Sequence, residues 1–194
     1  NSVDLAWDLL MDEAYADLRR AIYVTEEDFL RFRQLVVNIV LATDIMDKDL
    51  KQLRNGRWNK AFSDEVVLDE SPEIQVNRKA TIVMEHLIQA SDVAHTMQHW
   101  HIYRKWNQRL FFELYKAFSE GRADKDPSEF WYEGEKGFFD FYIIPLAKKL
   151  KECGVFGVSS DEYLQYALQN RKEWELKGMQ IVAEMMENLT KGKK

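Results

Sequence analysis

Histidines and an aspartate gather between positions 86 and 101, and these residue types bind metal ions or transfer protons. The four histidines of the chain are His86, His95, His99 and His101. Asp92, His95 and His99 are spaced i, i+3 and i+7, so a helix would place them on one face, where they could share a metal ion. Histidines near Trp and Met are more often packed or surface residues, and Asp92 by itself reads as a solvated carboxylate. Periodicity alone therefore favours the structural interpretation of this stretch.

Aromatic side chains offer a second chemistry, because a flat ring can stack on another ring. The densest run is Phe138, Phe139, Phe141 and Tyr142. A second stripe places Tyr103, Trp106 and Leu110 at helical spacing. Both groups are interpreted first as residues of the hydrophobic core. Glu133 and Glu135, on either side of Gly134, are interpreted first as part of a solvated turn.

Composition narrows the classes of protein. The net charge of −6 argues against nucleic-acid binding, which needs a concentrated basic face. Hydrophobic residues at 46% and charged residues at 31% argue against a disordered chain and against a membrane-embedded one. The single cysteine, Cys153, excludes an intrachain disulfide and fits a reducing compartment.

Helices must position these residues, because only eight glycines and three prolines are present and no stretch alternates as a strand would. Apolar spacing predicts one helix over 4–22. Thr25 is expected to cap the next helix, with Asp28 completing a capping box. Asn55-Gly56 is expected to break the helical pattern.

Further helices are predicted in the C-terminal half of the chain, with Pro145 kinking or splitting the helix that contains it. The fold class is all-α. The expected ranges of these helices are 77–91, 100–118, 138–150 and 160–189.

Four segments, in order and at compatible spacing, resemble class I 3′,5′-cyclic-nucleotide phosphodiesterases. The family segments are LATD, ADLSNP followed by LYRQW, QVGFIDYIVHPL, and NREWY. The matching segments are Val40–Asp44, Ala90–His95 with Tyr103–Trp106, Gly137–Leu146, and Asn170–Trp174. The resemblance covers roughly residues 28 to 186.

The resemblance implies an all-α, multi-helix phosphodiesterase catalytic domain fold, truncated at its N-terminal side. Residues 1–189 are expected to form the C-terminal portion of that domain and 190–194 a disordered basic tail. The family uses two divalent metal ions, zinc with magnesium or manganese. Its second metal-binding aspartate corresponds to Asp92. The other ligands and the general acid are expected upstream, so no catalytic residue is assigned and the isolated segment is expected to be inactive.

The resemblance also implies a purine pocket. A glutamine of the family binds the edge of the base and a phenylalanine three positions later stacks on its face; these positions are Glu135 and Phe138. An ionised carboxylate only accepts hydrogen bonds, and adenine offers an amino donor where guanine has a carbonyl. Cyclic AMP is therefore the expected substrate, unless burial keeps Glu135 protonated.

Four other residues are expected to shape this pocket. His95 replaces an asparagine of the family three residues after the metal aspartate. Ile45 stands where the family often has an apolar pocket residue. Trp106 and Leu110, one turn apart, are expected to line the wall beside the base.

The expected function is hydrolysis of cyclic nucleotides in signal transduction, and the expected location is intracellular and cytoplasmic. Whether the parent protein is multidomain or membrane-tethered stays open. The expected partner is the cyclic nucleotide, with no nucleic acid and no membrane contact from this segment; a homodimer stays open. One alternative is a non-catalytic helical module for dimerisation or regulation. Another is a more distant HD-type phosphohydrolase, which would not need the Phe138 clamp.

Overall fold

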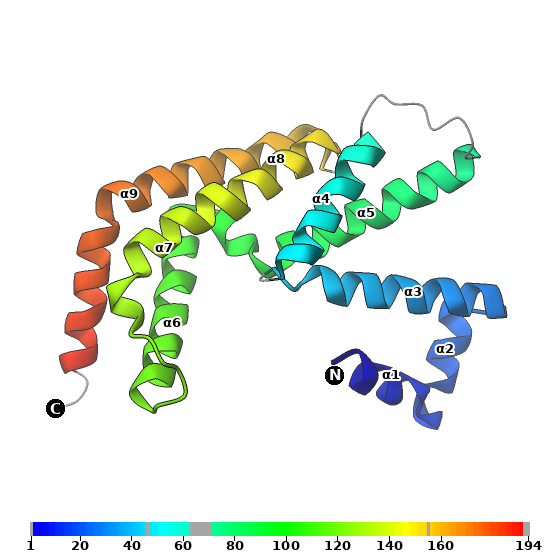
Figure 1. Ribbon diagram of the computed structural model, residues 1–194, viewed down its shortest axis with the longest axis horizontal. Helices are drawn as coiled ribbons and strands as arrows, with labels where there is room; N and C mark the ends of the chain where they lie inside the picture. The colour runs from blue at the N-terminus through cyan, green and yellow to red at the C-terminus, as the bar shows by residue number, and fades with distance from the viewer. Residues whose placement is uncertain (1, 46, 63–70, 155, 192–194) are drawn as a thin grey trace. The chain divides into compact units, whose positions relative to one another are not determined.

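Helices make up nearly all the regular structure of this chain (Figure 1). The computed structural model describes residues 2–45, 47–62, 71–154 and 156–191, and no β-strand occurs in these ranges. The prediction of an all-α fold is confirmed. The chain divides into two units, Asn1–Asp92 and Val93–Lys194, and each is described by itself.

The first unit begins with a broken helix where a continuous one was predicted over 4–22. Helix α1 (Ser2–Met11) ends before Asp12, whose carboxylate accepts a hydrogen bond from the Ala14 amide at 2.9 Å. A short 3-10 turn, η1 (Glu13–Tyr15), then leads into α2 (Ala16–Ile22). Because an aspartate competes for local backbone donors, it favours a cap over a continued helix here.

Helix α3 (Glu26–Ala42) starts as predicted. The Thr25 hydroxyl accepts from the Asp28 amide at 3.1 Å, and the Asp28 carboxylate accepts from the Thr25 amide at 3.2 Å. This reciprocal pair is the expected capping box. It fixes the start of α3, which in turn ends at the segment resembling LATD.

Helix α4 (Lys48–Phe62) runs straight through Asn55-Gly56, so the predicted break is wrong. Helices α4 and α5 (Pro72–Asp92) lie next to each other (Figure 1). Arg54 and Trp58, on either side of Asn55-Gly56, are buried, and the Trp58 ring meets His86 of α5 with centroids 4.4 Å apart. The free energy of this packing outweighs the roughly 1 kcal/mol that glycine costs inside a helix.

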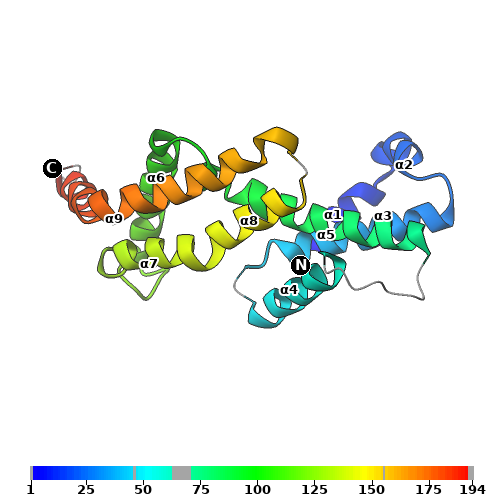
Figure 2. The same ribbon diagram turned by 90° about the horizontal axis from the view of Figure 1, so that it is seen from above.

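The second unit carries most of the predicted site. Its longer helices are α6 (Trp100–Ser119), α7 (Trp131–Phe138), α8 (Ile144–Glu152) and α9 (Ser160–Lys191). Short turns connect them: η2 (Ala94–Met97), η3 (Pro127–Glu129) and η5 (Gly157–Ser159). Helices α8 and α9 run side by side in both views (Figure 2).

Large aromatic side chains form the core of this unit. Trp174, Tyr103, Phe111 and Phe139 are each 0% exposed. The Tyr103 ring meets Phe139 edge-on at 5.2 Å and Trp174 at 6.0 Å. Helices α6, α7 and α9 are thereby locked around one aromatic cluster.

Pro145 splits its helix, as predicted. A π-helical turn, η4 (Phe139–Ile143), joins α7 to α8, and the Ile144 amide donates to the Phe139 carbonyl across it. Pro145 follows within the first turn of α8. Because proline has no N–H to donate to the carbonyl four residues back, the α-helical hydrogen bonds are interrupted at the π turn, and α8 starts anew with Pro145 in its first turn.

Helix α9 extends two residues into the segment for which a disordered tail was predicted. The Thr190 hydroxyl donates to the Glu187 carbonyl at 2.7 Å, and the Lys191 ammonium pairs with the Glu187 carboxylate at 2.6 Å. Residues 192–194 of that predicted tail lie outside the described residues.

Gly178 of α9 lies against the ring of Tyr132 on α7 and that of Trp174 on its own helix. A methyl group at this position would lie 2.8 Å from a Trp174 ring atom and 2.9 Å from a Tyr132 ring atom. We therefore expect Gly178→Ala to lower the free energy of unfolding by about 1–3 kcal/mol, as overpacked cores do. Chemical denaturation followed by circular dichroism measures this change.

Gly134 provides the matched control. It lies inside α7, and a methyl group there would meet only a Phe130 ring atom at 3.8 Å. Gly134→Ala should raise the free energy of unfolding by about 0.5–1 kcal/mol, because alanine favours the helix. Equal effects of the two substitutions would contradict the close packing at Gly178.

Candidate functional site

Glu135 on α7 lies against α6. The Tyr103 hydroxyl donates to its Oε2 at 2.7 Å. The Asn107 amide nitrogen donates to the Tyr103 oxygen at 3.3 Å, and the Trp131 indole N–H donates to the Asn107 carbonyl oxygen at 3.2 Å. Tyr103, Asn107 and Trp131 are all buried. The carboxylate predicted to bind the base is thus the end of a three-step hydrogen-bond chain.

The direction of these three hydrogen bonds is set by Trp131. An indole nitrogen can only donate, so the Asn107 oxygen must accept and its nitrogen must face Tyr103. The Tyr103 proton then goes to Glu135. The Glu135 Oε2 atom is thus held as an acceptor by Tyr103, and the carboxylate, when ionised, has no proton of its own to donate.

The protonation state of Glu135 follows from competing effects. Burial raises the pKa of the Glu135 carboxyl, and hydrogen bonds from Tyr103 and Asn107 offset part of that rise. Burial, and then the nearby Glu135 charge, raises the pKa of Tyr103 well above its ordinary value. Tyr103 therefore remains a proton donor to Glu135 throughout the physiological range.

The raised pKa of Glu135 predicts a pH dependence of stability. The folded chain holds this proton more tightly than the unfolded chain, so the stabilisation is present below the unfolded pKa. It is lost as pH rises from about 4.3 through the folded pKa. Glu135→Gln should flatten this fall, measured as the free energy of unfolding against pH.

Tyr103→Phe should have the opposite effect on the pH dependence of stability, and it changes the side-chain volume little. It removes a hydrogen bond that favours the ionised carboxylate, so the fall in stability should extend to higher pH. A profile unchanged in both variants would show that Glu135 does not titrate in this environment.

Phe138 lies one turn after Glu135, at the last position of α7. Its ring stacks on Tyr142 with centroids 5.4 Å apart and an angle of 22° between the planes. Phe138 is half-buried, whereas its neighbour Phe139 is fully buried in the core. The structure thus buries Phe139 in the core, leaves Phe138 half-buried against Tyr142, and exposes Phe141.

Three more of the predicted residues lie on or beside α6. Trp106 and Leu110 are 47% and 45% exposed and share the stripe that begins with Tyr103. The His95 ring, half-buried on η2, lies 6.4 Å from the Trp106 ring, and burial lowers the pKa of this histidine. The Arg109 guanidinium lies 5.0 Å from the Trp106 centroid.

Ile45 and Asp92 belong to the first unit. Asp92 is the exposed last residue of α5, and Ile45 is half-buried just beyond α3. The turn before Ile45 is held by two side chains. The Arg54 guanidinium donates to the Asp44 carbonyl at 3.0 Å, and the Gln89 amide donates to the Ala42 carbonyl at 2.9 Å.

Comparison with known proteins decides the family. Residues 3–156 match the sequence profile of 3′5′-cyclic nucleotide phosphodiesterase. The chain belongs to this phosphodiesterase family. Val40–Asp44 and Gly137–Leu146, the segments that resemble LATD and QVGFIDYIVHPL, lie inside this range.

Individual relatives agree with the profile. The chain is 23% identical over 144 residues to "Dual specificity calcium/calmodulin-dependent 3′,5′-cyclic nucleotide phosphodiesterase 1B" of Bos taurus, covering 68% of this chain and 24% of that protein. It is 24% identical over 156 residues to "Probable 3′,5′-cyclic phosphodiesterase pde-3" of Caenorhabditis elegans, covering 74% and 22%. The chain thus spans about a quarter of the length of these curated relatives.

The fold also matches a solved phosphodiesterase domain. The phosphodiesterase domain of Salpingoeca rosetta rhodopsin phosphodiesterase superimposes with a TM-score of 0.64 at 19% identity, covering 96% of this chain and 56% of that one. The chain therefore shares the helical fold over slightly more than half of that domain.

The divalent metals used by phosphodiesterases require a set of carboxylate and imidazole donors. Within the described ranges, no three His, Cys, Asp or Glu side chains lie close enough together to hold a metal ion. Asp92, which the sequence resemblance predicts as a metal ligand, is the exposed last residue of α5. The donors of the described residues do not fit a two-metal site by themselves.

The partners of Glu135 were missed by the sequence analysis. Tyr103 was interpreted mainly as core, and Asn107 and Trp131 were given no role. A signal was available, because Tyr103 and Asn107 are four residues apart and so lie on one helical face.

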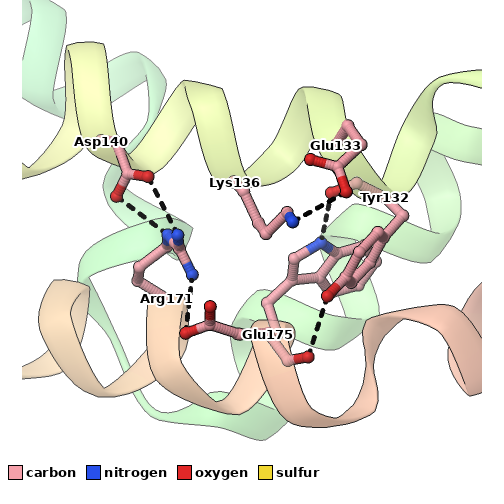
Figure 3. A network of polar contacts seen from close by, with 7 residues as sticks. Tyr132, Glu133, Lys136, Asp140, Arg171 and Glu175 are labelled. Atoms are coloured by element: carbon pink, nitrogen blue, oxygen red, sulfur yellow. Dashed lines mark hydrogen bonds and ion pairs between the residues drawn. The ribbon is translucent and has the colours of Figure 1, made fainter.

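A second polar cluster missed in the sequence joins α7 to α9 (Figure 3). Arg171 donates to both Asp140 oxygens, at 2.8 and 3.0 Å. The Trp174 indole donates to the Tyr132 carbonyl at 3.1 Å. Both Asp140 and Arg171 fall in segments that resemble the family, and their opposite charges were the available signal.

Proposed function

We propose that this chain forms the purine-binding part of a phosphodiesterase catalytic domain that hydrolyses 3′,5′-cyclic nucleotides to 5′-nucleotides. In this reaction water adds to phosphorus, the bond from phosphorus to the 3′ oxygen breaks, and a 3′ hydroxyl is released. The observation that carries the proposal is the pairing of Glu135 with an accessible Phe138 one turn later. It places a hydrogen-bonding group and a stacking ring on one short helix.

Each predicted site residue has a part in this proposal. Phe138 stacks on the purine, Glu135 binds its edge, and Trp106 and Leu110 line the wall beside it. From the family resemblance, His95 is also proposed to contact the nucleotide. The same resemblance is the basis for proposing Ile45 as a nucleotide contact and Asp92 as a metal ligand in the metal-dependent parent.

We propose that the preferred substrate is cyclic AMP. When Glu135 is ionised, its carboxylate, whose Oε2 accepts from Tyr103, offers the base an acceptor and no donor. That acceptor suits the exocyclic amino group of adenine, whereas the carbonyl of guanine at the same position would repel it. Lowering the pH through the pKa of Glu135 should reduce the preference for cyclic AMP over cyclic GMP, because the protonated carboxyl can donate a hydrogen bond to the guanine carbonyl.

The test compares kcat/KM for cyclic AMP and cyclic GMP in the full-length protein, across pH. We expect a ratio above about 10 in favour of cyclic AMP where Glu135 is ionised, because one correct hydrogen bond in place of a repulsive pair is worth about 1.4 kcal/mol or more. A preference for cyclic GMP would contradict this assignment. It would mean that the N1–H and 2-amino donors of guanine meet the carboxylate instead.

A second proposal concerns the chain by itself. Since Asp92 alone corresponds to a metal ligand of the family, the isolated chain is expected to show no hydrolysis of either nucleotide with Mn²⁺ or Zn²⁺. Release of 5′-AMP or 5′-GMP by the purified chain, abolished by chelation, would refute this.

The competing function is a non-catalytic role in dimerisation or regulation, which Glu135 at the position of the family glutamine keeps open. Turnover by the full-length protein separates the two. The proposed location is intracellular, where cyclic nucleotides act as messengers. None of the helices in the described ranges is long and apolar enough to cross a membrane.

A further inference from the structure

The continuous helical segment formed by α7 and the π turn η4 is joined to α9 at two places, one on each side of the candidate purine-binding pair Glu135 and Phe138. At the N-terminal side, the Tyr132 hydroxyl donates to the Glu175 carbonyl at 3.0 Å, and the Tyr132 ring lies against Gly178. At the C-terminal side, the Arg171 guanidinium donates two hydrogen bonds to the Asp140 carboxylate (Figure 3).

The Asp140–Arg171 contact is the more constrained of the two. Two parallel hydrogen bonds fix the plane of the guanidinium against the carboxylate. The Arg171 side chain is only 19% exposed, and its remaining end contacts the Glu175 carboxylate at 3.3 Å. Few other positions of Asp140 would satisfy this geometry.

The π turn explains how Asp140 reaches α9. In a regular α-helix, Asp140 would be rotated about 80° from Tyr132, because eight residues exceed two turns by that angle. A π turn is wider and rotates less per residue, so it brings Asp140 back toward the face that Tyr132 presents to α9. The π turn begins at Phe139, directly after Phe138.

We propose that Asp140 and Arg171 are positioning residues for purine binding, which set the rotation of α7 and so direct Phe138 and Glu135 toward the base. This inference rests on the proposed function. Neither residue need touch the nucleotide. Their contribution is the orientation of the helix end that carries the stacking ring.

The first test is hydrogen exchange of the π-turn amides in the purified chain. Arg171→Gln should speed exchange of the amides at 139–144 at least 10-fold. Arg104→Gln is the matched control, because Arg104 also pairs with a carboxylate of α9, Glu184, at 2.9 Å but lies outside this junction. It should leave those amides unchanged.

The second test is the Kd of the chain for cyclic AMP. Arg171→Gln should weaken binding at least 10-fold and Arg104→Gln by less than 2-fold. Arg171→Lys separates positioning from stability, because lysine keeps the charge without the two-pronged grip. It should restore Tm to within a few degrees of the parent and leave cyclic AMP binding weak.

The outcomes are distinct. If Arg171→Gln leaves both exchange and Kd unchanged, or if both arginine variants weaken binding equally, the positioning role is overturned. If the unaltered chain does not bind cyclic AMP, the proposed purine-binding role of the chain fails. The exchange rates at 139–144 then still decide whether Arg171 orders this junction.

Discussion

Replacing Phe138 by alanine is expected to weaken cyclic AMP binding roughly 5- to 150-fold, because base stacking on an aromatic ring contributes about 1–3 kcal/mol. The loss should appear in the Kd of the chain and in the KM of the full-length protein. Phe138→Tyr or Phe138→Trp should retain most of the affinity, because both keep a stacking surface. Titration of a fluorescent cyclic AMP analogue measures these differences.

Phe141 supplies the control for this substitution. It lies three residues further along the same aromatic run and is 76% exposed, but it falls on the π turn rather than on α7. Phe141→Ala should change the Kd for cyclic AMP by less than about 2-fold, as surface substitutions usually do. Equal losses at the two positions would remove the special role assigned to Phe138.

Replacing Trp174 by alanine is expected to lower the free energy of unfolding by about 3–5 kcal/mol, the usual cost of truncating a large buried aromatic residue. Trp174 is 0% exposed, donates to the Tyr132 carbonyl and meets the Tyr103 ring edge-on. Its removal leaves a cavity where three helices meet and removes the indole hydrogen bond to the Tyr132 carbonyl. Urea denaturation measures the change.

Trp106→Ala is the matched tryptophan control. Trp106 is 47% exposed, so its loss should cost less than about 1 kcal/mol. If both substitutions destabilised the chain equally, Trp174 would not be the centre of the core of the second unit.

Local signals in the sequence predicted local structure well. The capping box of Thr25 and Asp28 needs only the residues within one turn, and it formed as predicted. Pro145 likewise splits its helix because proline lacks an N–H wherever it occurs. Both effects act over a few residues, so tertiary contacts do not override them.

Signals that depend on tertiary packing were less predictive. Asn55-Gly56 was expected to end a helix, yet α4 continues because Arg54 and Trp58 are buried around it. Helix propensities differ by about 1 kcal/mol, which is less than such burial contributes. The sequence offers no direct measure of that burial.

The candidate site likewise combines features that local sequence predicts with features that depend on tertiary packing. The family resemblance pointed to Glu135 and Phe138, whereas the pattern around Gly134 indicated a solvated turn. The structure places both residues on α7. The partner of Glu135 is Tyr103, which is 32 residues away in the sequence and whose hydroxyl direction depends on Asn107 and Trp131. Such a chain of donors and acceptors can be followed only once side-chain positions are known.

The central claim is that Phe138 and Glu135 bind the purine together, and a crystal of the chain soaked with cyclic AMP tests it most directly. The account predicts the adenine ring stacked on Phe138 at about 3.5–4 Å. It also predicts the 6-amino group within about 3.2 Å of the Glu135 oxygen that Tyr103 leaves free. An ordered nucleotide bound elsewhere, with Phe138 and Glu135 untouched, would contradict it.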